Sequence, residues 1–88
     1  MLIRQGVPRD HIFIRKLSAR VFARFGAYET TLPAMAGRPG VYTLIAETDR
    51  QSIGFAMYTF EARAAADLLA IAVLPEWQKQ GAGKLLLN

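Results

Sequence analysis

The sequence has 88 residues, which is enough for one small domain and too few for two. Hydrophobic residues make up 52% and charged residues 20%, a balance that excludes a disordered tail. The absence of cysteine excludes disulfide scaffolds, thiolate metal sites and cysteine nucleophiles, and the single histidine, His11, cannot form an imidazole metal site alone. Eleven Lys and Arg residues against seven Asp and Glu residues give a net charge of +4, which favours anionic ligands in general.

No segment of the sequence is apolar over the length of a membrane span. The longest uninterrupted apolar stretch, Leu68 to Leu74, is far short of the roughly 18 residues that a spanning helix needs. Near the start of the chain, Arg4, Arg9 and Asp10 interrupt any apolar secretory segment. We therefore predict a cytoplasmic protein that does not cross a membrane.

The first half of the chain predicts one strand and two helices. Met1 to Gln5 is predicted as a short strand, and Asp10 as the cap of the helix that follows. From His11 to Phe25 apolar residues recur at helical spacing, which predicts an amphipathic helix that ends at Gly26. A brief helix over Tyr28 to Met35 and a loop rich in glycine and proline come next.

The second half predicts an antiparallel hairpin, a third strand and a final helix. The hairpin strands are Val41 to Glu47 and Ile53 to Phe60. Asp67 to Leu74 is apolar after its first residue, which is typical of a strand covered on both faces. The final helix, from Ala82 onward, has about two turns before the sequence stops, whereas average helices have about three. We therefore expect these residues to be the first part of a larger fold, or to be completed by another chain.

The segment after the third strand carries the most chemical information. A proline break and a polar loop lead to Gly81 and Gly83 at the start of the final helix. The first N–H groups of a helix lack partners within it, and the helix dipole adds positive potential there. The two glycines leave room for a close ligand, and Lys79 and Lys84 add charge. The pattern predicts a site for a phosphate or pyrophosphate, although the glycines alone would also suit tight packing of a helix on a strand.

Two common glycine motifs do not fit this segment. A Walker A loop needs Gly and Ser or Thr where Gln78 and Leu85 stand. A dinucleotide-binding fingerprint needs a third glycine where Leu86 stands. Neither class of nucleotide site is therefore expected.

The spacing that does fit is Gln78-x-x-Gly81-x-Gly83 after a strand that ends in Val73-x-Pro75. This stretch resembles the acetyl-coenzyme A signature of the GNAT superfamily of N-acetyltransferases, and within it the bacterial enzymes that acetylate protein N-termini. The order of elements over nearly the whole chain is similar as well. The resemblance implies an α/β (α+β) fold with a mixed, mostly antiparallel sheet, helices on both faces, and truncation soon after the signature. We expect residues 1–88 to form a single, partial domain of this type.

The resemblance implies that acetyl-CoA is the co-substrate and that no metal is used. By likeness to the family, the backbone of the signature strand would hydrogen-bond the pantetheine arm, and the N–H groups of the loop would hold the pyrophosphate. Gln78 stands where the family has Gln or Arg. The residues implied in CoA binding are Ile71, Ala72, Val73, Gln78, Lys79, Gln80, Gly81, Ala82, Gly83 and Lys84.

In such enzymes a deprotonated amine attacks the thioester directly. Asp67 stands where some histone-acetylating relatives carry a catalytic glutamate, so it is the candidate base, and it would need burial for that task. Tyr28 and Glu29 are predicted to line the acceptor site, because this region often does so in relatives. The family's usual tyrosine acid and most acceptor contacts lie beyond the signature, so we do not expect turnover from this segment as an isolated monomer.

Two functions from different classes follow. The first is an acetyl-CoA-dependent N-acetyltransferase, or the cofactor-binding part of one, whose acceptor amine (a small molecule, a protein N-terminus or a lysine) and exact acyl donor stay open. The alternative is a non-catalytic half-domain that pairs with a second copy or another chain through its open sheet edge and residues 85–87. The basic series of the first helix is predicted to be a solvated face, so nucleic acid is not an expected partner.

Overall fold

The computed structural model describes residues 1–60 and 66–87. Strands β1 (Leu2–Gln5), β2 (Val41–Thr48), β3 (Gln51–Phe60) and β4 (Ala66–Val73) form a sheet in the order β1-β2-β3-β4, and each neighbouring pair is antiparallel. The helices are α1 (His11–Val21), α2 (Tyr28–Ala36) and α3 (Ala82–Leu87). Single 3-10 turns span Pro8–Asp10, Ala23–Phe25 and Pro75–Trp77.

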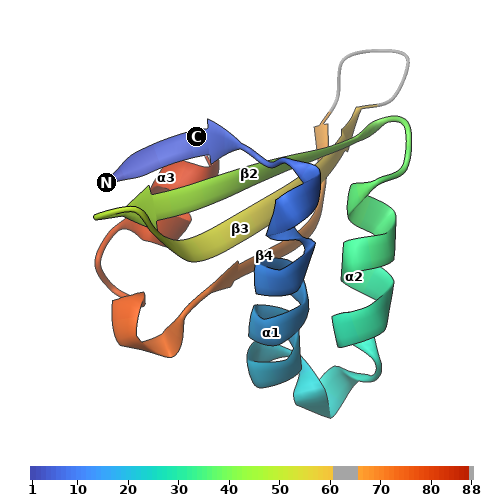
Figure 1. Ribbon diagram of the computed structural model, residues 1–88, viewed down its shortest axis with the longest axis horizontal. Coiled ribbons are helices and arrows are strands. Elements are labelled where there is room, and N and C mark those ends of the chain that lie inside the picture. Colours follow the sequence, from blue (N-terminus) through green and yellow to red (C-terminus); the bar gives the residue numbers. More distant parts are fainter. Residues whose placement is uncertain (61–65, 88) are drawn as a thin grey trace.

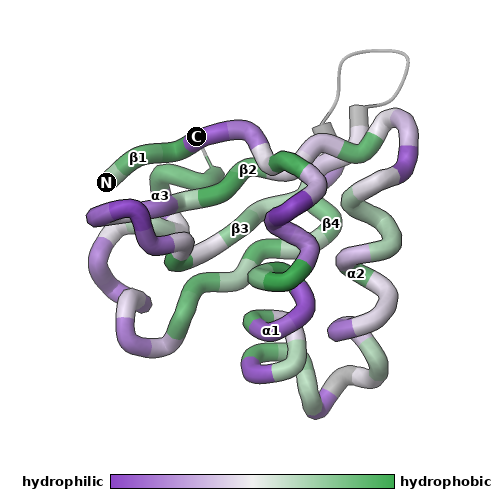
Figure 2. Tube along the Cα trace, in the orientation of Figure 1, coloured by the Kyte–Doolittle hydropathy of each residue, from purple (hydrophilic) through white to green (hydrophobic). Residues whose placement is uncertain are grey.

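Helices cover both faces of the sheet, as the sequence predicted (Figure 1). On one face α1 and α2 lie side by side. Their buried residues Ile14, Leu17 and Leu32 pack against Phe55 and Met57 of β3. In Figure 2, α1 alternates between hydrophobic and hydrophilic colours, as expected of a helix with one apolar stripe.

The short helix α3 covers the opposite face. Its Ala82 and Leu86 are buried against Ile53 of β3 and Val73 of β4. The Tyr58 hydroxyl donates a hydrogen bond to the Leu86 carbonyl at 2.6 Å, which fixes the far end of α3 on the sheet. This hydrogen bond near the end of α3 therefore helps to hold the whole helix, including its start after the predicted anion loop, against the sheet.

Two element boundaries differ from the sequence predictions by more than one residue. β3 begins at Gln51 rather than Ile53, because Asp49 and Arg50 form a two-residue hairpin turn with φ of +49° and +66°. α1 ends at Val21 rather than Phe25, and Phe22 leaves helical geometry with ψ of 13°. The Phe22 ring instead packs edge-to-face on the Tyr28 ring, with 5.6 Å between the two ring centroids. This contact brings the start of α2 against the end of α1.

Asp10 does not cap α1 through its side chain, contrary to the sequence prediction. Its carboxylate accepts hydrogen bonds from both terminal nitrogens of Arg4, at 2.8 and 2.9 Å, and from the Val7 N–H at 2.7 Å. The Arg4 Nε also donates to Glu47 at 3.0 Å. The Arg4 guanidinium holds the pKa of Asp10 below its usual range. This network joins β1 and β2 to the entry of α1.

The prediction that β4 is covered on both faces is wrong for its first half. Leu68 and Leu69 are 44% and 38% exposed, whereas Ala72 and Val73 are buried. The reason is that the clusters beneath α1 and α3 include Ala70 to Val73 of this strand and no residue of its first half. No helix in the described part of the chain is long and apolar enough to cross a membrane.

Candidate functional site

The loop between β4 and α3, where the sequence predicts an anion site, contains two residues in the left-handed region. After the turn at Pro75–Trp77, Lys79 and Gly81 adopt positive φ angles of +70° and +91°. Backbone of this kind directs successive N–H groups toward one side of the loop and forms a concavity that binds anions. α3 then begins at Ala82, so the loop runs directly into a helix N-terminus.

Several N–H groups of this loop have no hydrogen-bond partner within the part of the chain that the structure describes. The N–H groups of Gln78, Gln80 and Leu85 donate to carbonyls of the loop. The remaining N–H groups from 79 to 84 have no such bond among the described residues: they belong to Lys79, Gly81, Ala82, Gly83 and Lys84. Unpaired N–H groups with this orientation can donate to phosphate oxygens.

The three glycines near α3 differ in what their surroundings require. A Cβ atom at Gly54 of β3 would come within 2.9 Å of the Ala72 carbonyl oxygen, so packing requires glycine there. At Gly81 the positive φ favours glycine, and the space beyond is open. At Gly83 neither reason applies, because φ is not in the left-handed region and a Cβ would meet nothing within 4 Å. Tight packing of helix on strand therefore explains Gly54 and not Gly83.

Gln78 ties the loop to the strand. Its Nε2 donates a hydrogen bond to the Val73 carbonyl at 3.1 Å, so the side chain turns back toward β4. Lys79 and Lys84 are both exposed, and neither forms a salt bridge with an acid among the described residues. The loop therefore combines N–H donors, an anchored start and two cationic side chains.

The predicted pantetheine strand lies directly before this loop. Ile71, Ala72 and Val73 pair with β3 along one edge of β4. The described sheet has no strand on the other edge, where the Val73 carbonyl accepts the hydrogen bond from Gln78. The structure thus brings the two predicted parts of the CoA site together at one end of β4.

A pocket of about 380 Å³ lies between the helices and the first half of β4. It is lined by Phe22, Tyr28, Leu32 and residues 68–71. Tyr28 thus lies beside β4, whereas Glu29 and Asp67 are not among its lining residues. The sequence predicted Tyr28 as part of an acceptor site but not the β4 wall of this pocket. That wall depends on a register shift in β4, which the sequence does not reveal.

Asp67 is exposed at the start of β4, where it pairs with Thr59 in the strand register. The burial that a base at this position would need is not present. Its catalytic role is therefore a hypothesis that the surroundings of Asp67 do not support.

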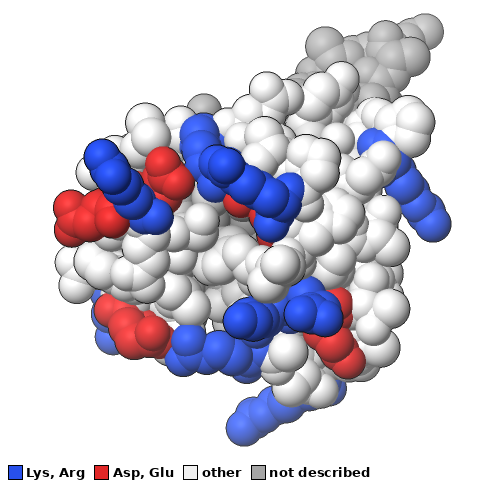
Figure 3. Space-filling model, in the orientation of Figure 1, with Lys and Arg blue, Asp and Glu red and all other residues white. Residues whose placement is uncertain are grey.

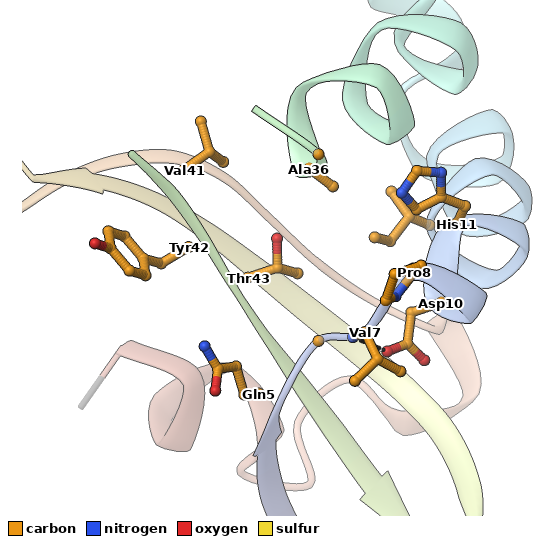
Figure 4. Close-up of a pocket in the computed structure, with 12 residues that line it drawn as sticks. Gln5, Val7, Pro8, Asp10, His11, Ala36, Val41, Tyr42 and Thr43 are labelled. Atoms are coloured by element: carbon orange, nitrogen blue, oxygen red, sulfur yellow. Dashed lines mark hydrogen bonds between the residues drawn. The ribbon is translucent and has the colours of Figure 1, made fainter. Parts of the chain in front are cut away.

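A second, smaller pocket of about 230 Å³ lies near the β1–β2 edge of the sheet, between the start of α1 and the end of α2 (Figure 4). Its Asp10 accepts a hydrogen bond from Val7, drawn as a dashed line, and also binds Arg4. The buried hydroxyl of Thr43 has no hydrogen-bond partner among the described residues. No sequence pattern pointed to this pocket, and it is separate from the loop after β4.

On the face that Figure 3 shows, charged side chains lie apart from one another in several places, and some have an opposite charge beside them. Arg20 of α1 pairs with Glu76 at 2.8 Å and lowers the pKa of that carboxyl. This exposed contact links α1 to the turn that precedes the anion loop. No group of three or more potential metal ligands occurs among the described residues.

The fold and this loop agree with the family comparison. The acetyltransferase (GNAT) domain model matches residues 39–88, which is more than half of the chain. The chain therefore belongs to the GNAT acetyltransferase family. No protein of curated function matches the sequence.

Solved structures share the fold at low sequence identity. A ribosomal-protein-alanine N-acetyltransferase from Brucella melitensis biovar Abortus 2308 is 17% identical, with a TM-score of 0.84, over 99% of this chain and 66% of that one. The aminoglycoside N-acetyltransferase AAC(6')-Iy, solved with a CoA bisubstrate analogue, is 22% identical, with a TM-score of 0.76, over 98% and 65%. An aminoglycoside 6'-N-acetyltransferase complexed with coenzyme A is 17% identical, with a TM-score of 0.80, over 100% and 52%. This chain thus spans less than two thirds of these proteins.

Proposed function

We propose that this chain forms the acetyl-CoA-binding part of an N-acetyltransferase that acts on a primary amine. The observation that carries the proposal is the set of unpartnered N–H groups from Lys79 to Lys84, at the end of β4, in a GNAT-family chain. Two neighbours of the same fold were solved with coenzyme A or a CoA analogue, which supports a CoA ligand. The cytoplasmic location predicted from the sequence stays a prediction.

In the proposed site the loop N–H groups of residues 79–84 bind the pyrophosphate, and Lys79 and Lys84 add attraction to it. Gln78 holds the loop against Val73, so these donors keep one orientation. The open edge of Ile71 to Val73 offers backbone groups to the pantetheine arm. When bound, acetyl-CoA supplies an activated acetyl group to the amine.

The amine acceptor is proposed to approach from the side of Tyr28 and β4. Tyr28 lines the pocket there, and Glu29, the next residue of α2, lies outside the lining. The amine must lose a proton before it attacks. Asp67, at the start of β4, is the candidate base of this proposal.

The decisive experiment compares two glycine variants in CoA binding by calorimetry. Gly81→Asp places a negative charge in the loop and should abolish binding. Gly40→Asp is the matched control, because Gly40 also has a positive φ, +82°, and open space around it, but lies in the loop before β2. The control should bind CoA like the unmodified chain. Unchanged affinity in Gly81→Asp would refute the proposed site.

A second candidate function is pairing with another chain or a second copy. It is favoured by the exposure of Leu68 and Leu69 on the end strand β4 and of Leu85 and Leu87 on α3. Exposed apolar strand edges promote association. Sedimentation would test this, because a monomer at micromolar concentration contradicts it.

A further inference from the structure

We infer that the acceptor of this enzyme is an amine with an apolar substituent, rather than a polycation, and that the pocket between α2 and β4 receives this substituent. The inference rests on the proposed function, since it identifies the pocket as the acceptor side of that site. It goes further because it names the chemical class of the acceptor.

The described lining of the pocket is mainly apolar. Among the seven described residues that line it, the Tyr28 hydroxyl is the single polar side-chain group, and none of the seven carries a charge. Leu32 is 3% exposed, whereas Leu69 at the mouth is 38% exposed. A volume of about 380 Å³ lies within the range of small-molecule sites.

An irregularity in β4 explains why so much apolar surface gathers on this side. Met57 of β3 pairs with Ala70, and the next residue, Tyr58, pairs with Leu68, so Leu69 is an extra residue in the strand. In a regular strand only alternate residues face one side. Here a bulge at Leu69 lets consecutive residues, Leu68 to Ala70, line one pocket; Ile71 also borders it, although its side chain packs against the cluster beneath α3.

The pocket also continues the proposed path of the donor. Ile71 belongs both to the pocket and to the strand segment proposed for the pantetheine arm. The anion loop lies beyond Val73, at the opposite end of that segment. The order along β4 is therefore anion loop, pantetheine segment and apolar pocket, which places the pocket at the acyl end.

Charge decides between the two kinds of acceptor. A cation that enters an apolar site loses its hydration and needs a carboxylate partner. Glu29 and Asp67 each follow or precede a lining residue in sequence but do not line the pocket. An amine with one apolar substituent can bury the substituent and leave its nitrogen at the mouth. Partial desolvation there also favours the neutral amine, which is the form that attacks.

The test titrates the 88-residue chain, without CoA, with n-butylamine, n-pentylamine, n-hexylamine and 1,6-diaminohexane. Backbone amide chemical shifts of residues 68–71 report on the pocket. Affinity should rise about fourfold for each added methylene, in line with the burial of one CH₂ group. The diamine, which matches hexylamine in length but carries a second charge, should bind at least about tenfold more weakly.

Two variants of exposed residues complete the test. Leu69→Asp should weaken hexylamine binding about tenfold or more, because it places a charge beside the apolar substituent. Ile12→Asp, at an exposed apolar site of α1 outside the lining, should leave it unchanged. Thermal unfolding checks that both variants fold.

The inference is overturned if the diamine binds as tightly as hexylamine, if no amine shifts residues 68–71, or if longer acyl chains on CoA, rather than longer amines, gain affinity. CoA binding is measured separately. Binding of CoA without amines would overturn the acceptor class alone, whereas binding of amines without CoA would overturn the proposed function.

Discussion

The side-chain amide of Gln78 donates to the carbonyl of Val73, the last residue of β4, at 3.1 Å. This contact closes the turn at Pro75–Trp77 and fixes where the anion loop begins. Gln78, which belongs to the signature, is thus a positioning residue: its hydrogen bond fixes the loop whose N–H groups lie on other residues. Preorganised donors bind an anion without the free-energy loss of ordering the loop.

Gln78→Ala should therefore weaken CoA binding several-fold and lower the free energy of unfolding by about 1 kcal/mol, the usual effect of losing one hydrogen bond. Calorimetry and urea unfolding measure the two quantities. Gln51→Ala is the control, since Gln51 at the start of β3 is exposed, lies outside the loop, and its side chain forms no hydrogen bond within the described residues. Equal CoA affinity in the two variants would show that Gln78 does not order the loop.

Gly83→Ala separates the stability of the helix from its binding role. Because a Cβ at Gly83 meets nothing and its φ is ordinary, alanine should stabilise the chain by about 0.5–1 kcal/mol through its higher helix propensity. The same methyl group occupies the space proposed for pyrophosphate, so CoA affinity should fall by about tenfold or more. Thermal unfolding and calorimetry should thus move in opposite directions. A variant that gains stability and keeps full affinity would place the anion elsewhere.

The order of elements, the hairpin and the position of the loop between β4 and α3 were predictable, because each depends on local patterns. Glycine spacing and a proline break are visible in the sequence, and the family match supports their interpretation. The extra residue at Leu69 and the end of α1 at Val21 were not predictable, since both depend on packing between distant segments. The same holds for Asp10, whose partner Arg4 also binds Glu47, 43 residues away from Arg4 in the sequence. Local pattern placed Asp10 at a helix start but could not show what its carboxylate binds.

The Arg4–Asp10 pair predicts acid sensitivity. The pKa of Asp10 is lower in the folded chain than in the unfolded chain, where it is about 3.9. The pair therefore stabilises the fold at pH values above the unfolded pKa, and this stabilisation is lost as the pH falls through the folded pKa. Asp10→Asn should lower the free energy of unfolding at pH 7 by about 2 kcal/mol. It should also flatten the loss of stability below about pH 4. Urea unfolding from pH 2 to 7 measures both quantities. If the variant lost as much stability below about pH 4 as the unmodified chain, other carboxyl groups would be responsible for the loss.

Gly54→Ala tests the packing that positions β4 beneath α3. Its Cβ would lie 2.9 Å from the Ala72 carbonyl oxygen, 3.2 Å from Val73 Cγ2 and 3.4 Å from Leu86 Cδ1. Backbone atoms cannot rotate away, so β4 must shift, and we expect a loss of about 1–3 kcal/mol in the free energy of unfolding. Gly37→Ala is the matched control, because it has open space and an ordinary φ, and should change stability by less than about 1 kcal/mol. Because Ala72 and Val73 belong to the proposed pantetheine segment, Gly54→Ala should also weaken CoA binding under conditions where the variant is folded. A destabilised variant with normal CoA affinity would show that CoA binding does not depend on how β4 packs against Gly54.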